Sequence, residues 1–133
     1  VQGYKDGLDN AKTVTKKMFG YRPKNFIMFL LRHIAAICKV ESIYAVSDEG
    51  FYANSHMVRG NKSKVAVLDT LWEDIGGTVL ESDPNYFTIP LEEERKPMEE
   101  IKSQKRSQYR NRYALLDEYE TIIQENIKPY VRA

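Results

Sequence analysis

Apolar residues recur at helical spacing through the first third of the chain. Four of them, three or four positions apart with lysines between, predict a short amphipathic helix from Leu8 to Phe19 that ends at Gly20: Leu8, Ala11, Val14 and Met18. Proline is typical of a first helical turn, and Pro23 precedes a longer apolar repeat. This repeat predicts a second helix with apolar positions Ile27, Leu30, Leu31, Ile34, Ile37 and Cys38.

The middle of the chain changes to short β-rich runs. Ser42 to Ser47 predicts a buried strand. Asp48 to Ser63, with its glycines and asparagines, predicts a loop, and a strand at Phe51 to Ala53 stays an alternative. Apolar spacing predicts a third helix from about Lys64 to Ile75, which Gly76-Gly77 would end.

The last part of the chain predicts a strand and a long helix. Tyr86 to Pro90 is a β-rich run that stops at its proline. Helical character follows from Pro97, where early glutamates suit the positive end of the helix dipole; a break near Ser103 is an open alternative. One face of this helix comprises Tyr109, Tyr113, Leu116, Ile123, Ile127 and Tyr130.

Strands that alternate with helices predict an α/β fold, with α+β as the alternative. We expect a few-stranded sheet flanked by helices, with a long C-terminal helix. A chain of 133 residues can bury a core without disulfides, and a lone Cys38 cannot form an internal bridge. Two or three strands are few for an independent sheet, and the first residue is Val1 rather than Met. We therefore expect residues 1–133 to be a single domain from the C-terminal part of a longer protein.

The near-zero net charge of +1 hides a segregation of charge along the chain. Residues 1–39 carry a net charge of +6, residues 40–94 carry −8 and residues 95–133 carry +3. Surfaces of opposite sign follow from this distribution. They could serve partners, or the segments could pair with one another within the fold.

Several function classes lack their sequence signals. No apolar run reaches the ~20 residues that span a bilayer. The spacing of Cys and His predicts no metal site, and there is no phosphate-loop, dinucleotide or nucleophile-elbow motif. We expect His33 to be a partly buried histidine of the second helix, His56 to be an exposed loop residue, and Cys38 to be a packing residue.

Two basic segments are candidates for binding. Gly20, Tyr21, Arg22, Pro23 and Lys24 precede the second helix, where unpaired amides and two cations would suit a phosphate or carboxylate. In the long helix, five cations are predicted to fall largely on one side, beside two tyrosines, as in surfaces that bind nucleic acid or anionic lipid: Lys102, Lys105, Arg106, Arg110 and Arg112. The simpler alternatives are a turn that needs no ligand and a solvated or internally paired helix face. The sequence contains no recognisable nucleic-acid-binding module, so sequence-specific binding of nucleic acid is not expected.

Motifs along nearly the whole chain resemble those of the VirK/YbjX family of bacterial proteins. The most specific are Trp72-Glu73-Asp74-Ile75-Gly76-Gly77 and the run from Lys105 to Tyr113, Lys-Arg-Ser-Gln-Tyr-Arg-Asn-Arg-Tyr. Asp48 and Leu71 depart from the pattern, since members tend to have asparagine and an aromatic residue there. The family has no assigned biochemical function. The resemblance implies a link to virulence, resistance to antimicrobial peptides and the state of the bacterial envelope.

The element order also resembles the C-terminal half of the GNAT acyltransferase fold. This resemblance implies that Gly20 to Lys24 forms the loop that holds the pyrophosphate of coenzyme A, and that acyl-CoA or an acyl carrier protein is the donor. Ile43 to Ser47, Val65 to Gly76 and Tyr86 to Pro90 would be the following strand, helix and strand. Many GNAT enzymes carry a tyrosine acid where this chain has Trp72, so no catalytic residue is assigned.

Two functions follow as hypotheses. The chain could be a GNAT-like acyltransferase that acts on an envelope component. Alternatively, it could be a non-enzymatic interaction protein whose basic helix face binds an acidic partner or an anionic membrane. Both are compatible with a cytoplasmic protein, with or without peripheral attachment to the inner membrane.

Overall fold

The structure is a computed structural model that describes residues 6–51 and 68–131. Its described residues divide into two compact units. Unit 1 contains those up to Lys39 and from Arg95 onward, and unit 2 those from Val40 to Glu94. The charge segregation follows this division: both positive segments belong to unit 1, and the negative segment is unit 2.

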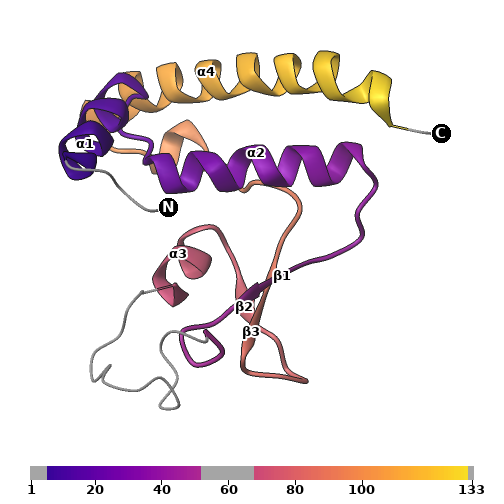
Figure 1. The fold of residues 1–133 in the computed structure, drawn as a ribbon. Coiled ribbons are helices and arrows are strands. Elements are labelled where there is room, and N and C mark those ends of the chain that lie inside the picture. The colour runs from indigo at the N-terminus through magenta and orange to yellow at the C-terminus, as the bar shows by residue number, and fades with distance from the viewer. Residues whose placement is uncertain (1–5, 52–67, 132–133) are drawn as a thin grey trace. The chain divides into compact units, whose positions relative to one another are not determined.

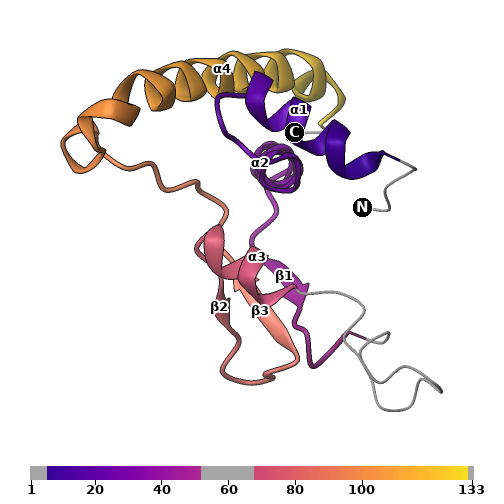
Figure 2. The same cartoon turned by 90° about the vertical axis from the view of Figure 1, so that its left-hand side faces the viewer.

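Unit 1 is helical. Its elements are α1 (Gly7–Lys17), α2 (Pro23–Ile37) and α4 (Ser103–Ile127), with short 3-10 turns η2 (Met98–Glu100) and η3 (Lys128–Tyr130). The two predicted N-terminal helices are confirmed. Figure 2 looks along the axis of α2 while α4 is seen from its side, so the two helices cross (Figures 1 and 2). The predicted break near Ser103 is confirmed as well, because Ile101 and Lys102 have extended backbone between η2 and α4.

The turn between α1 and α2 is a tight helix ending. The Phe19 amide donates to the Lys16 carbonyl, and the Gly20 amide donates to the Thr15 carbonyl, which is the hydrogen-bond pattern of a Schellman motif. Phe19 has φ 56° and Gly20 has φ 82°, so two successive residues are left-handed. The chain then turns into Pro23, which is the first helical residue of α2.

The core of unit 1 lies where α2 and α4 meet. Phe29, Leu116 and Ile123 form a buried cluster, and Leu116 is fully buried. Seven partly buried residues pack around the cluster: Tyr21, Phe26, Leu30, Ile37, Tyr113, Tyr119 and Ile127. The face predicted for the long helix is therefore confirmed from Tyr113 to Ile127, whereas Tyr130 is exposed and Tyr109 is not part of the cluster.

The apolar side predicted for α2 is largely not the side that enters this core. Ile27, Leu31 and Ile34 are exposed by 47%, 45% and 36%. Cys38 is also exposed, so its prediction as a packing residue was wrong. The reason is that α2 is apolar on most of its circumference, and the aromatic residues Phe26 and Phe29 contact the large side chains of α4. Helical spacing alone could not choose between the two apolar sides.

Unit 2 contains a three-stranded antiparallel sheet in the order β1-β3-β2. The strands are β1 (Ile43–Val46), β2 (Thr78–Val79) and β3 (Tyr86–Ile89). Ile43 pairs with Ile89 and Thr78 pairs with Thr88, so β3 lies in the middle of the sheet. β1 and β3 match the predicted strands, although β1 is partly exposed rather than buried. The sequence did not predict β2, because a strand of two residues is too short to show an alternation of apolar and polar positions.

The helix of unit 2, α3 (Asp69–Asp74), is shorter than predicted. Leu68 is its N-cap residue, so the helix begins at Asp69 rather than at about Lys64. Residues 64–67, most of the alternative strand at Phe51 to Ala53, and His56 lie outside the described residues. The predicted end is confirmed: Gly76 has φ 86°, and the Gly77 amide donates to the Trp72 carbonyl over 2.7 Å.

Polar contacts tie α3 to the end of β1. The Asp48 carboxylate accepts from the Leu68 amide over 2.6 Å, and the Asp69 carboxylate accepts from the Asp48 amide over 2.7 Å. The indole Nε1–H of Trp72 donates to the Val46 carbonyl over 2.8 Å. These bonds explain the Trp72 signature structurally, because the indole holds the start of the helix against the sheet.

Candidate functional site

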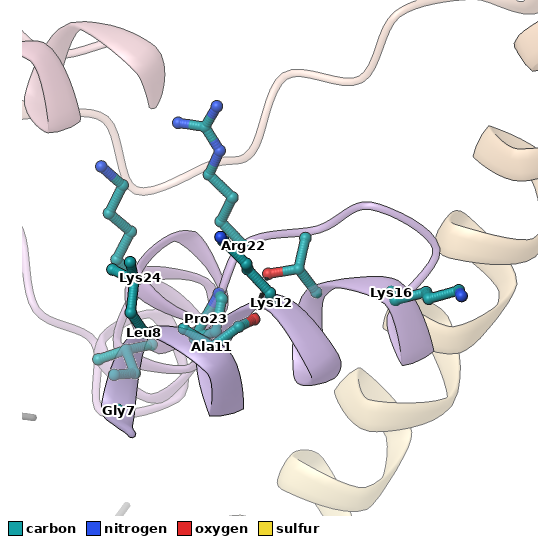
Figure 3. Close-up of a pocket in the computed structure, with 10 residues that line it drawn as sticks. Gly7, Leu8, Ala11, Lys12, Lys16, Arg22, Pro23 and Lys24 are labelled. Carbon is teal, nitrogen blue, oxygen red and sulfur yellow. Dashed lines mark hydrogen bonds between the residues drawn. The ribbon is translucent and has the colours of Figure 1, made fainter. Parts of the chain in front are cut away.

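A groove of about 870 Å³ lies between α1 and the first turns of α2, within unit 1 (Figure 3). This volume is in the range of small-molecule sites. Ten residues line the groove: Gly7, Leu8, Ala11, Lys12, Thr15, Lys16, Arg22, Pro23, Lys24 and Ile27. Three of the five residues predicted to hold a phosphate group are among them.

The groove carries positive charge and no acidic lining residue. Lys12 and Lys16 are one helical turn apart on α1, while Arg22 and Lys24 flank the first residue of α2. In Figure 3 the side chains of Arg22 and Lys24 extend in the same general direction. Within residues 6–51 and 68–131, none of these four cations has an ion pair or a side-chain hydrogen bond. Four unneutralised cations around one groove favour an anionic ligand.

The start of α2 adds backbone donors beside two of these cations. Arg22 is the helix cap, has extended backbone and makes no side-chain capping bond. Pro23 has no N–H, and the amides of Lys24 and Asn25 donate to no acceptor in the described parts of the chain. Such amides and the helix dipole stabilise negative charge.

Apolar side chains form the rest of the groove. Leu8 and Ala11 come from α1, and Pro23 and Ile27 from α2. Figure 3 shows Leu8, Ala11 and Pro23 gathered together, with Lys16 farther along α1. Leu8 is 75% exposed and Ile27 is 47% exposed, so both present apolar surface that no described residue covers. The groove is thus amphipathic.

The other two predicted residues of this segment lie against α4. A Cβ atom at Gly20 would come within 2.6 Å of Gln108 Nε2 and 2.9 Å of Arg112 Nη2, so glycine permits this close approach. The Tyr21 ring packs at the edge of the core. Neither residue lines the groove, and both hold the turn that presents Arg22.

The five cations predicted on the long helix have different surroundings. Arg112 donates through Nε and Nη2 to the Phe19 carbonyl, over 3.1 and 2.9 Å. Its guanidinium carbon lies 4.2 Å from the Tyr109 ring centroid and 5.7 Å from that of Tyr21. Arg106 donates to the carbonyls of Met98 and Ile101 and thereby closes the turn before α4. Arg106 thus holds the turn before α4, and Arg112 holds the end of α1 against α4, both within unit 1.

The other three cations of that basic segment, Lys102, Lys105 and Arg110, are exposed. They have no hydrogen bond or ion pair from their side chains among the residues that the structure describes. The two candidate segments of the sequence adjoin at Arg112, which joins α4 to the turn ahead of Arg22. A pattern search along the chain could not bring them together, because 93 positions separate Phe19 from Arg112.

Sequence reasoning selected three of the ten groove residues and missed seven, four of which give the groove its charge or its large apolar side chains. Lys12 and Lys16 looked like an ordinary solvated face of an amphipathic helix, and Leu8 and Ile27 looked like core residues. One feature of the sequence could have indicated the two lysines: they precede, and Arg22 and Lys24 follow, the same short turn between two predicted helices.

The single histidine that the structure describes is half-buried. The His33 ring centroid lies 4.3 Å from that of Phe29, and Nδ1 lies 3.9 Å from Glu120 Oε1. This matches a packed histidine at the edge of the core. In the described ranges, no three His, Cys, Asp or Glu side chains are grouped to hold a metal ion. No helix there has both the length and the apolar character that crossing a membrane requires.

The chain matches the model of a family described as a protein of unknown function (DUF535), over residues 1–125. The match covers nearly the whole chain, and the chain therefore belongs to this family. The resemblance to VirK/YbjX proteins is thereby confirmed.

Curated relatives come from two bacteria. The uncharacterised protein YbjX of Escherichia coli K12 is 36% identical over 121 residues, which cover 84% of this chain and 36% of YbjX. Two uncharacterised proteins of Haemophilus influenzae Rd are 27% and 33% identical, over 96% and 88% of this chain and 42% and 40% of their own lengths. The chain thus spans about two-fifths of the length of these relatives. No solved structure matches it.

Proposed function

We propose that the groove between α1 and α2 holds the phosphate groups of an acyl donor, and that the protein is a GNAT-like acyltransferase. The observation that carries this proposal is the set of four cations around one groove without an acidic lining residue. Arg22 and Lys24 would bind the pyrophosphate of coenzyme A, or the single phosphate of an acyl carrier protein, together with the adjacent amides of α2. After the turn, the order α2, β1, α3 and β3 follows the GNAT-like pattern and supports the assignment, whereas helix α1 precedes the turn where that fold has a strand.

The reaction would pass an acyl group from a thioester to an amine. The new C–N bond forms as the C–S bond breaks, the amine loses a proton, and the thiolate leaves and is protonated. Such a step needs alignment, stabilisation of the oxyanion, and groups that accept and donate protons. Trp72 is not the acid, because an indole N–H is not an acid in this pH range and here donates to the Val46 carbonyl. Following the family resemblance, we propose a component of the bacterial envelope as the acceptor.

Arg22→Ala is expected to weaken binding of coenzyme A about 10- to 100-fold, because each charge-assisted hydrogen bond contributes about 1.5–3 kcal/mol. Isothermal titration calorimetry of the full-length protein measures this change. Arg110→Ala is the matched control, since Arg110 is an exposed arginine of α4 and does not line the groove. If the full-length protein binds neither coenzyme A nor an acyl carrier protein with its phosphopantetheine group, or if both variants weaken binding equally, the proposal is wrong.

A second candidate function rests on three exposed cations at the cap and in the first turns of α4, whose side chains have no partner among the described residues. We propose as the alternative that Lys102, Lys105 and Arg110 dock the protein on an acidic partner or an anionic membrane without catalysis. Their lack of described partners supports this alternative, while Arg106 and Arg112 do not contribute because they donate to backbone carbonyls.

For this alternative, Lys105→Glu combined with Arg110→Glu is expected to abolish salt-sensitive binding to vesicles of anionic phospholipid, since each surface cation contributes about 1 kcal/mol. Co-sedimentation with vesicles measures the loss. Lys96→Glu with Lys128→Glu makes the same charge change at exposed positions outside that segment and is the control. Binding by the parent protein that is insensitive to salt would count against this function.

A further inference from the structure

We infer that the acyl donor of this groove carries a long alkyl chain, which lies along an exposed apolar stripe on α2. This inference rests on the proposed function, because it assigns the donor's phosphate to Arg22 and Lys24. It adds the class of donor: a long-chain acyl thioester of coenzyme A rather than acetyl-CoA.

The stripe begins inside the groove. Ile27 lines the groove, and Leu31 and Ile34 follow on the same side of α2 at intervals of four and three residues. All three are at least 36% exposed, although isoleucine and leucine are among the residues most often buried. From Ile27 to Ile34 the stripe extends about 10 Å at 1.5 Å per residue.

The groove widens this apolar surface on the side of α1. Leu8 and Ala11 lie across from Ile27, and Leu8 is 75% exposed. An alkyl chain laid between the two helices would therefore be covered from two sides at its start. The cations stand around the same groove, so one ligand would meet charge and apolar surface together. This combination fits an amphiphile with a phosphate head better than a small polar anion.

The affinity of the protein for acyl-CoA should depend on the length of the acyl chain. Burial of one methylene contributes about 0.8 kcal/mol, which corresponds to an increase in affinity of about fourfold. An open groove buries each methylene only in part, so we expect decanoyl-CoA to bind at least tenfold more tightly than acetyl-CoA. Calorimetry of the full-length protein with coenzyme A, acetyl-CoA, hexanoyl-CoA and decanoyl-CoA, all in monomeric form, measures the series.

Ile27→Asn is expected to flatten the rise in affinity from acetyl-CoA to decanoyl-CoA. Ile122→Asn is the matched control, because Ile122 lies on α4, is 45% exposed and is outside the groove. Leu31→Asn is a second variant, and its effect should appear only with the longer chains. Because these side chains are already exposed, their replacement leaves the α2–α4 core intact.

The outcomes separate the two proposals. If neither coenzyme A nor an acyl carrier protein is bound, the proposed function and this inference both fail. If only the acyl carrier protein is bound, the proposed function stands and the inference is overturned. If coenzyme A binds but affinity does not rise with chain length, the proposed function stands and the inference is overturned. An equal rise in the parent and Ile27→Asn also overturns it. The inference is also overturned if Ile27→Asn reduces binding to vesicles of anionic phospholipid while acyl length has no effect on affinity in the coenzyme A series. The stripe would then bind a membrane rather than an acyl chain.

Discussion

Leu116→Ala should lower the free energy of unfolding by about 2–5 kcal/mol, the range for leucine replaced by alanine in a packed core. Leu116 is fully buried in the cluster with Phe29 and Ile123. Truncation removes three carbon atoms from the place where α2 and α4 meet, and rigid aromatic neighbours cannot fill the space completely. Both the lost burial and the remaining cavity contribute to the cost.

The measurement is urea denaturation followed by far-ultraviolet circular dichroism, to which the helices of unit 1 contribute strongly. Ile122→Ala is the control, because it shortens an aliphatic side chain on the same helix at a position that is 45% exposed. The urea concentration at the midpoint of unfolding should change little in Ile122→Ala. Equal shifts for the two variants would contradict the location of the core.

Gly77→Ala should destabilise unit 2 by about 1–3 kcal/mol, the cost of forcing extra atoms into a well-packed site. A Cβ atom there would lie 2.8 Å from the Trp72 carbonyl oxygen and 2.9 Å from Ile89 Cδ1. The first contact is to backbone and cannot be relieved by a rotamer change. The Gly77 amide also donates to that same carbonyl, so a shift that relieves the clash would weaken the bond that ends α3.

Fluorescence of Trp72 reports this change, since it is the single tryptophan of the chain and belongs to unit 2. Gly7→Ala is the control, because a Cβ atom at Gly7 meets no atom within 4 Å. Because Gly7 belongs to unit 1 and alanine favours helix more than glycine does, that variant should leave the unfolding transition reported by Trp72 unchanged. A Gly77→Ala protein with unchanged stability would show that close packing is not why glycine occupies this position.

The sequence predicted those elements whose signal is local. The repeats of α1 and α2, the glycine ending of α3 and the proline after β3 each depend on neighbouring residues, and the structure has all of them. It could not predict which apolar side of α2 enters the core, because that depends on the aromatic residues of α2 meeting α4. The start of α3 was misplaced because the apolar spacing of the sequence continues upstream of Leu68, which is the cap of the helix in the structure.

The candidate site was predictable only in part for a similar reason. Arg22, Pro23 and Lys24 were selected because a glycine, a proline and cations precede a helix. Lys12 and Lys16 join them only through the fold of the turn, which places α1 beside the start of α2. The anchoring of Phe19 by Arg112 depends on a contact between distant parts of the chain. Local patterns contain no information about such contacts.

Cys38 gives the protein a ready position for a spectroscopic label. It is the single cysteine of the chain, it is exposed, and it caps the end of α2 one residue before the end of the first segment of unit 1. A thiol-reactive acceptor dye at Cys38 would pair with Trp72 as the donor, without any mutation. Energy transfer from Trp72 in unit 2 to the dye in unit 1 could then be recorded before and after coenzyme A is added. A change in transfer efficiency would report that occupation of the groove moves one unit relative to the other.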